Sequence, residues 1–159
     1  MQRFPLLAST ALALLTACVQ APVEVTKNAP FGFVVAPSTA FQNRLNTERA
    51  RKGASPLSYS AQLTAAAQMH ANDMSRNNFF SHQSSNGGRL GNRVLAQGYG
   101  FCWTGENISA GYSRLDEAFD GWVRSTGHYL NMMSRDATEF GLAEADGNYR
   151  VLVLGRPGC

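Results

Sequence analysis

The fold class of this chain is decided by FGLAEADGNYRVLVL, residues 140–154. This stretch holds two short apolar-rich runs, 140–144 and 149–154, on either side of the sequence Ala-Asp-Gly-Asn. Turn residues between two such runs predict a β-hairpin, because glycine and asparagine accept the backbone angles of a tight turn. We therefore expect the domain to end in two antiparallel strands.

Helical signals come before this hairpin. Ser38 and Ser60 can each cap a segment in which apolar residues recur three and four positions apart, as is typical of a helix. A short helix is expected over 90–97. A fourth helix, capped by Ser113, carries the clearest apolar stripe: Leu115, Ala118, Phe119, Trp122 and Val123. Because helices come first and strands later, the chain is predicted to be an α+β domain with helices packed on an antiparallel sheet.

The first residues have the pattern of an export signal. Arg3 precedes an apolar run over 6–15 that is too short to cross a bilayer as a helix. The run ends in Leu-Thr-Ala-Cys18, which resembles the bacterial lipobox, where the cysteine is lipidated and becomes the new first residue. Cleavage by the ordinary signal peptidase at residues 19–21 is the alternative. We expect residues 1–17 to be a lipoprotein signal peptide.

The rest of the chain divides into a tether and one domain. Residues 18–38 contain three prolines and little periodicity, which indicates a lipid-anchored tether, and 39–159 form the domain. Val19 and Gln20 carry no inner-membrane retention signal, so we expect an outer-membrane lipoprotein of a Gram-negative bacterium, on its periplasmic or surface face. The membrane is then a partner through Cys18. The basic residues are scattered and form no stripe, so no nucleic-acid partner is expected.

Two cysteines remain besides Cys18. Cys102 and Cys159 would pair in an oxidising compartment, and two free buried thiols are the alternative. We expect the disulfide.

Three histidines are the main candidates for chemistry. His82 and His128 each follow a predicted helix, at a helix-to-loop junction of the kind that displays functional side chains, and Glu106 lies between them in sequence. Two imidazoles and one carboxylate could bind a zinc-like metal with one position open, or share protons as acid and base. His70 falls on a buried helical stripe and is predicted to be a core residue. Ser81 and Ser125 lie in no recognisable nucleophile elbow.

An ordered set of short motifs covers nearly the whole domain. The pieces are Leu45-Asn46, Arg49, Gly53, Pro56-Leu57, His70-Ala71, Asp73-Met74, Phe79-Phe80-Ser81-His82, Gly98-Tyr99, Gly105-Glu106-Asn107-Ile108, Trp122, Ser125, Gly127-His128, Asn131-Met132-Met133 and Phe140-Gly141. Together they resemble the CAP superfamily of cysteine-rich secretory, antigen 5 and pathogenesis-related proteins (SCP-like extracellular domains), and most of all its bacterial members.

This resemblance implies a three-layer α-β-α sandwich with a cleft across a small sheet. In the family two histidines and two glutamates line the cleft, and some members bind zinc or another divalent ion there. His82, Glu106 and His128 match three of these positions, whereas serine stands near 125 where the second glutamate is expected. The resemblance therefore implies a metal site of two histidines and one carboxylate.

Three functions follow from these expectations. The missing glutamate and the lack of a clear nucleophile favour a non-enzymatic module that binds a lipid or other small ligand through the cleft. The second is a metal-dependent hydrolase or peptidase that uses Glu106, His82 and His128. The third is a structural envelope protein with a vestigial cleft.

Overall fold

The computed structural model describes residues 39–159, and the predicted signal peptide, Cys18 and the tether lie outside the described residues. The elements, in chain order, are α1 (Thr39–Arg51), β1 (Ser58–Tyr59), α2 (Ala61–Asn77), α3 (Leu90–Ala96), β2 (Phe101–Ser109), α4 (Leu115–Arg124), α5 (Thr126–Met133), β3 (Glu139–Ala145) and β4 (Tyr149–Pro157). None of these helices is long and apolar enough to serve as a membrane span.

The four strands form one sheet in the order β1-β3-β4-β2. The predicted hairpin is confirmed as β3 and β4, and its turn has positive φ at Gly147 and Asn148. β2 pairs antiparallel with the other side of β4. The short β1 pairs parallel with β3, so the sheet is mixed and the expectation of a purely antiparallel sheet is wrong in this detail.

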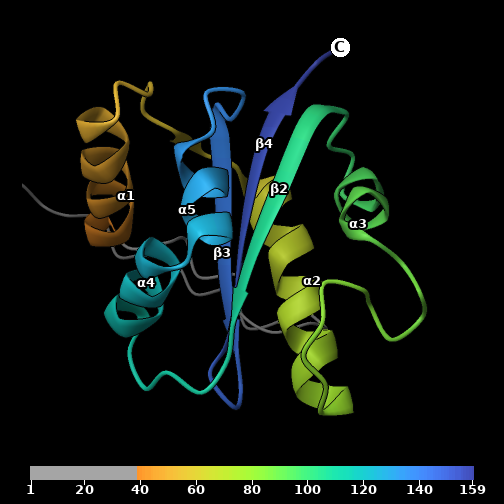
Figure 1. Ribbon diagram of the computed structural model, residues 1–159. Coiled ribbons are helices and arrows are strands. Elements are labelled where there is room, and N and C mark those ends of the chain that lie inside the picture. The colour runs from red at the N-terminus through yellow and green to blue at the C-terminus, as the bar shows by residue number, and fades with distance from the viewer. Residues whose placement is uncertain (1–38) are drawn as a thin grey trace, which may run out of the picture. The chain divides into compact units, whose positions relative to one another are not determined.

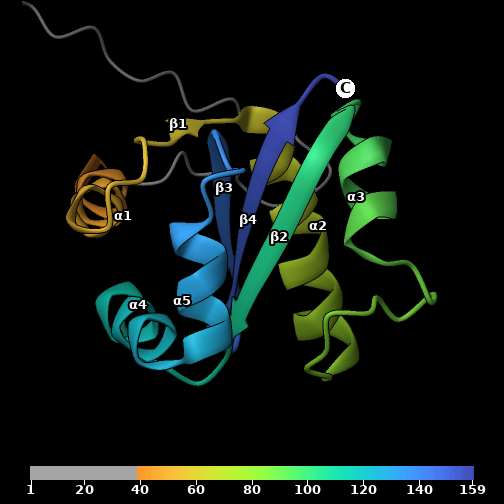
Figure 2. The same cartoon turned by 45° about the horizontal axis from the view of Figure 1, so that its top comes forward.

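Helices cover both faces of the sheet, which confirms the three-layer α-β-α sandwich. Figures 1 and 2 show α2 and α3 on one face and α1, α4 and α5 on the other. Alternate residues of β4 serve the two layers, as the pleat of a strand requires. Val151 and Val153 belong to the core beneath α2, whereas Leu152 and Leu154 belong to the core with α1, α4 and α5.

The helix α2 lies very close to the sheet because Gly141 of β3 has no side chain. A Cβ at this position would come within 2.1 Å of the backbone nitrogen of Thr64. This close approach sets the height of α2 above the sheet. The loop that leaves the C-terminus of α2 carries His82.

The helix α5 is held in place by a buried arginine. Arg49 of α1 is 0% exposed. It donates hydrogen bonds to the carbonyl oxygens of Met132 and Ser134, at the C-terminal end of α5, and also to those of Ser55 and Ala137. Desolvation lowers the pKa of this guanidinium from its ordinary value. Carbonyls at a helix end lack partners within the helix, and the guanidinium supplies them.

Two local expectations need correction, the place of His128 and the N-cap of the fourth helix. The strand β2 and the helix α5 were not predicted, and His128 lies in the first turn of α5 instead of a loop. The N-cap of α4 is Arg114 and not Ser113. The backbone N–H of Arg114 donates a hydrogen bond to the Glu117 carboxylate. The cap expected at Ser60 is confirmed by the start of α2, and the helix expected over 90–97 is confirmed as α3.

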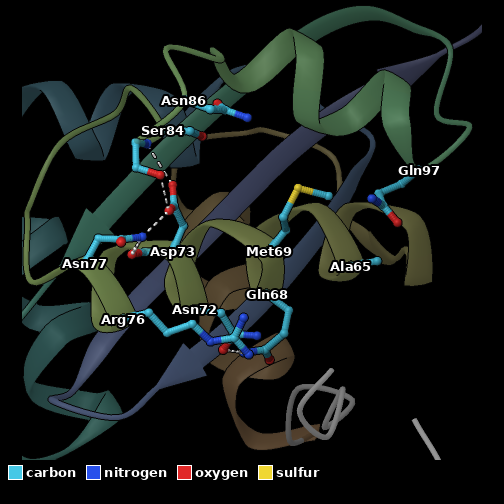
Figure 3. A pocket seen from close by; sticks show the side chains of 11 residues that line it. Ala65, Gln68, Met69, Asn72, Asp73, Arg76, Asn77, Ser84, Asn86 and Gln97 are labelled. Atoms are coloured by element: carbon cyan, nitrogen blue, oxygen red, sulfur yellow. Dashed lines mark hydrogen bonds between the residues drawn. The ribbon is translucent and has the colours of Figure 1, made fainter. Parts of the chain in front are cut away.

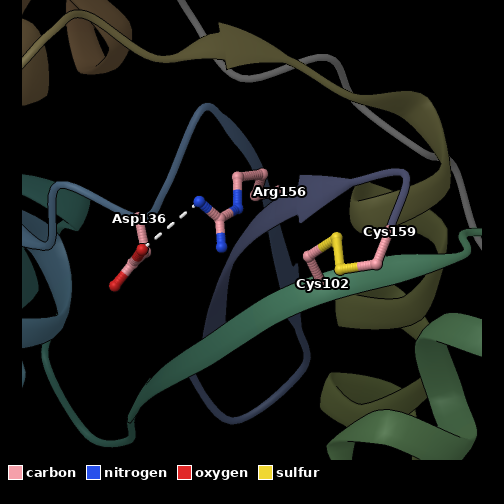
Figure 4. The surroundings of a disulfide bond; sticks show 4 residues. All are labelled: Cys102, Asp136, Arg156 and Cys159. Carbon is pink, nitrogen blue, oxygen red and sulfur yellow. Dashed lines mark ion pairs between the residues drawn. A yellow bond between two sulfur atoms is a disulfide. The ribbon is translucent and has the colours of Figure 1, made fainter.

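The predicted disulfide is confirmed. Cys102 of β2 and Cys159, just beyond β4, are joined with their Cα atoms 5.1 Å apart, as Figure 4 shows. Nearby, Arg156 forms an ion pair with Asp136 at 3.4 Å. The bond attaches the last residue of the sequence to the beginning of β2.

Candidate functional site

A cleft of about 750 Å³ brings the three predicted site residues together. It is lined by the loop after α2, the start of α3, the middle of β2 and the first turn of α5. The residues are Phe80, Ser81, His82, Gln83, Arg89, Leu90, Thr104, Gly105, Glu106, Ile108 and His128. Residues distant in sequence meet here because β2 is the last strand of the sheet, between α3 and α5 (Figure 1).

Glu106 is the buried centre of this cleft, with its side chain only 4% exposed. Its Oε1 accepts a hydrogen bond from Nδ1 of His82 at 2.8 Å. Its Oε2 accepts a hydrogen bond from Nη2 of Arg93 at 2.5 Å, and the Arg93 side chain is 3% exposed. Both carboxylate oxygens are therefore occupied by protein donors.

These contacts keep Glu106 ionised. Burial by itself would raise the pKa of the carboxyl group. The hydrogen bond from His82 and the charge of Arg93 outweigh that effect, so the pKa lies below its ordinary value. A carboxylate in this state is a poor proton acceptor near neutral pH.

Two buried side chains hold the loop that carries His82. Nε2 of His70 lies 2.8 Å from the carbonyl oxygen of Ser81, to which it donates. Nη1 of Arg93 donates to the His82 carbonyl oxygen at 3.2 Å and to the Ser84 hydroxyl at 3.0 Å. His70 is 0% exposed, so its predicted core role is confirmed. The His82 side chain itself is 58% exposed and reaches the cleft from a fixed backbone.

His128 faces the cleft from the other side of β2. Its carbonyl oxygen accepts a hydrogen bond from the Asn107 side chain at 2.9 Å, which joins the start of α5 to the strand. Desolvation, followed by the charge of His82, lowers the pKa of the His128 imidazole from its ordinary value. The ring is therefore neutral at neutral pH.

Arg93 is the site residue that sequence reasoning missed. It lies on the same face of α3 as Leu90 and Val94, three positions after Leu90 and one before Val94. Arg93 is 3% exposed. A buried arginine needs partners for its guanidinium group, and an acidic side chain is one group that can supply them. The burial of Arg93 on that stripe, together with an acidic residue set among apolar neighbours at 106, was the signal that could have found the pair.

In this cleft a metal would be held by the two histidine side chains. Among residues 39–159, no three His, Cys, Asp or Glu side chains are grouped so as to hold a metal ion. Both oxygens of Glu106 already accept hydrogen bonds. Glu106 is therefore better suited to orient His82 than to bind the metal directly. His82 then offers its other ring nitrogen, and His128 a neutral imidazole. Metal binding stays a prediction.

Within the described domain, neither Ser81 nor Ser125 forms a side-chain hydrogen bond with His82 or His128. The Ser81 hydroxyl accepts a hydrogen bond from the backbone N–H of Gln83 instead.

A second pocket, of about 550 Å³, lies on the outer side of α2. Figure 3 shows Met69 and the amide side chains of Gln68, Asn72 and Gln97 at its border. Its Asp73 carboxylate is occupied by the hydroxyl and backbone N–H of Ser85. None of the predicted site residues lines it.

Comparison with known proteins agrees with this architecture. An uncharacterised protein of Bacillus subtilis, YkwD, is 31% identical over 97 residues, which cover 61% of this chain and 38% of that protein. The uncharacterised membrane protein YlbC of the same organism is 33% identical over 97 residues, 61% of this chain and 28% of that protein. The chain thus spans well under half the length of these relatives.

Solved structures show the same fold. An extracellular protein of Bacillus anthracis that contains an SCP domain is 32% identical, with a TM-score of 0.70 over 74% of this chain and 39% of that one. An outer surface protein of Borrelia burgdorferi is 18% identical, with a TM-score of 0.69 over 75% of this chain and 91% of that one, and shares the fold. The CAP model, described as the cysteine-rich secretory protein family, matches residues 42–153, which is more than half of the chain. The protein belongs to the cysteine-rich secretory protein (CAP) family.

Proposed function

We propose that this CAP domain is a ligand-binding module of the cell envelope, and that its cleft takes an organic anion with an apolar part. The proposal rests on the burial of Glu106 and on the hydrogen bonds that its carboxylate accepts. Its two oxygens are held by His82 and Arg93, and its side chain is buried. A buried carboxylate whose two oxygens each already accept a hydrogen bond shapes a binding surface and is poorly placed to act as a general base.

The walls of the cleft indicate the class of ligand. Phe80 is 55% exposed and lines the cleft together with Leu90, so an apolar group has surface to cover. Arg89 is exposed beside them and forms no ion pair with a carboxylate in residues 39–159. An apolar wall next to an unpaired guanidinium suits a ligand that combines a carboxylate or phosphate with an apolar group.

The envelope location rests on separate support. The lipobox-like sequence that ends at Cys18 supports a lipid on the mature chain and the membrane as a partner, and the residues after Cys18 favour the outer membrane. The disulfide suits an oxidising compartment. Among similar proteins, one is described as extracellular and one as an outer surface protein.

Octanoate and 1-octanol test the binding proposal as a charged and an uncharged probe of equal chain length. We expect octanoate to shift the amide NMR signals of cleft residues and to bind about tenfold more tightly than octanol, because one charge-assisted hydrogen bond is worth about 1.5–3 kcal/mol. Phe80→Ala should weaken both probes, and Arg89→Gln octanoate alone. Leu95→Ala, which removes an exposed side chain of α3 outside the cleft, is the control. Equal binding by all variants would refute the proposal.

Zinc or another divalent ion is proposed as a weak additional ligand of His82 and His128. Bound zinc would act as a Lewis acid at the cleft. Calorimetric titration should show binding that weakens as pH falls through about 6, because protons compete for imidazoles. His82→Ala and His128→Ala should each abolish it, and Arg89→Gln should not. Equal binding by the two histidine variants and the wild type would exclude this site.

A metal-dependent hydrolase is the alternative function, and one contact favours it. The Glu106 carboxylate orients His82 in the way that carboxylates orient catalytic and metal-bound imidazoles. Ester and peptide substrates, each with and without zinc, distinguish the two functions. Zinc-dependent turnover that His82→Ala abolishes would establish the hydrolase.

A further inference from the structure

The strand β2 forms one edge of the sheet, and this edge runs through the cleft. β2 pairs only with β4, and its other side faces no strand. Three successive residues in the middle of β2, Thr104, Gly105 and Glu106, line the cleft. The directions of their backbone groups therefore decide what the cleft can bind.

Contacts at β4 fix those directions. The backbone N–H of Thr138 donates to the carbonyl oxygen of Gly155, so Gly155 turns its backbone groups toward the β3 side. Backbone groups alternate along a strand, so Leu154 turns toward β2 instead. Leu154 lies opposite Gly105 in the register. Gly105 thus pairs with β4, whereas Thr104 and Glu106 face the open edge.

Side-chain contacts on β2 confirm this alternation independently. The carbonyl oxygen of Glu106 accepts a hydrogen bond from the Asn131 side chain at 3.1 Å. Two residues further on, the carbonyl oxygen of Ile108 accepts a hydrogen bond from Nε1 of Trp122, also at 3.1 Å. Both carbonyls point away from β4, and side chains of α4 and α5 cap them. Strand edges are commonly protected by such covering groups.

The protection stops inside the cleft. By this alternation the N–H and C=O of Thr104 and the N–H of Glu106 face the open edge, and none of the loop, cap or side-chain hydrogen bonds of residues 39–159 uses them. Only the Thr104 hydroxyl is engaged, with the carbonyl oxygen of Leu154 at 3.0 Å. Two donors and one acceptor in strand spacing are thus offered to a ligand.

We propose that the cleft binds an extended peptide segment bearing a carboxylate, which adds as a short strand to the open edge of β2. This proposal rests on the binding function above and names its ligand class. The peptide main chain pairs with Thr104 and with the N–H of Glu106, as in strand addition to other exposed sheet edges. The Asn131 cap limits pairing to about three peptide residues. Arg89 is the partner for the carboxylate.

The test uses a blocked tetrapeptide, acetyl-Ala-Val-Ala-Asp-amide, with ¹⁵N-labelled protein. Binding should shift the amide signals of Thr104 and Glu106 and slow their hydrogen exchange, while Gly105 and Asn107 stay protected throughout. Two analogues carry one N-methyl group, on the second or on the third residue. Successive N–H groups of a strand point to opposite edges, so one analogue should lose at least about tenfold in affinity and the other should bind like the parent.

Two variants at Thr104 test whether its backbone N–H takes part in peptide binding. Thr104→Pro removes an N–H that the ladder to β4 does not use, and proline is tolerated where a strand N–H faces outward. Thr104→Val is its matched control, because it removes the hydroxyl and keeps the N–H. We expect peptide affinity to fall at least about tenfold further in Thr104→Pro than in Thr104→Val.

The outcomes separate the two proposals. Octanoate binding without peptide binding, or equal binding of both N-methyl analogues, would overturn strand addition and leave the binding module standing. If neither octanoate nor the peptide affects the cleft residues, both proposals fail. If Thr104→Pro does not fold, the N-methyl pair on the wild-type protein decides alone.

Discussion

Along β2, residues 101–104 are partly exposed, whereas residues 105–109 are buried. The buried half is held by side chains from three other elements: Arg93 pairs with its carboxylate, and Asn131 and Trp122 cap its carbonyls. The exposed half has the ladder to β4 and the disulfide at Cys102, and its side chains are only partly buried where Phe101 and Trp103 pack against the two cores.

The difference shows how a single strand can be both a core element and a display surface. Burial with dense side-chain contacts fixes Glu106 and its neighbours. In the partly exposed half, the disulfide at Cys102 restrains the strand without covering the backbone groups of its open edge. Thr104 lies at the boundary, which is where the cleft opens.

The largest effect is expected from removing the ion pair of the buried half. Arg93→Leu leaves the Glu106 carboxylate buried without a cationic partner, and breaking a buried pair in this way costs about 3–5 kcal/mol. Urea unfolding measures the loss. Arg89→Leu, an exposed arginine just before the same helix, should change stability by less than about 0.5 kcal/mol. Equal effects of the two variants would show that the buried half does not depend on this pair.

Reducing the disulfide tests the exposed half. We expect a loss of about 2–5 kcal/mol, typical of native disulfides in small secreted domains, seen as a lower melting temperature. Amide exchange should then accelerate at Trp103 while Asn107, in the buried half, stays protected. Uniform acceleration along β2 would mean that the two halves are not independent. Two alkylatable thiols in the untreated exported protein would show that the bond is absent.

The smallest effect is expected from a change of pH, through the buried His70. Desolvation, followed by the charge of Arg93, lowers the pKa of His70, and these outweigh the opposing charges of Glu106 and Asp73. The unfolded chain therefore binds a proton below about pH 6.5 that the folded domain does not. Stability should fall as pH drops below that value, by at most about 1.4 kcal/mol per pH unit.

His70→Gln is the control for this pH effect. It keeps a donor for the Ser81 carbonyl and removes the titration. The unfolding midpoint of the variant should change less between pH 7 and 5 than that of the wild type. An identical pH profile in both proteins would remove His70 as the cause. Glu106 acts in a more acidic window, because its lowered pKa stabilises the fold above about pH 4.5 and that contribution is lost below it.

Local signals in the sequence were enough for several features. The hairpin followed from a turn sequence between two apolar runs, and α2 from its cap and its stripe, because both depend on residues within a few positions of one another. The cysteine pairing followed from their number and the expected compartment. The burial of His70 followed from its place on the helical stripe.

The rest of the site follows from packing between segments that are distant in sequence. β2 shows no regular alternation of buried and exposed residues, because its two halves lie in different surroundings. α5 is only 8 residues long and is separated from α4 by the single residue Ser125. The Arg93–Glu106 pair and the open edge at Thr104 depend on which strand lies beside β4 and which helices cover it. Residue types and their spacing indicated which side chains can bind a metal or transfer a proton. The packing of distant segments determined which of their atoms are already paired and which remain free, because such contacts leave no trace in local periodicity.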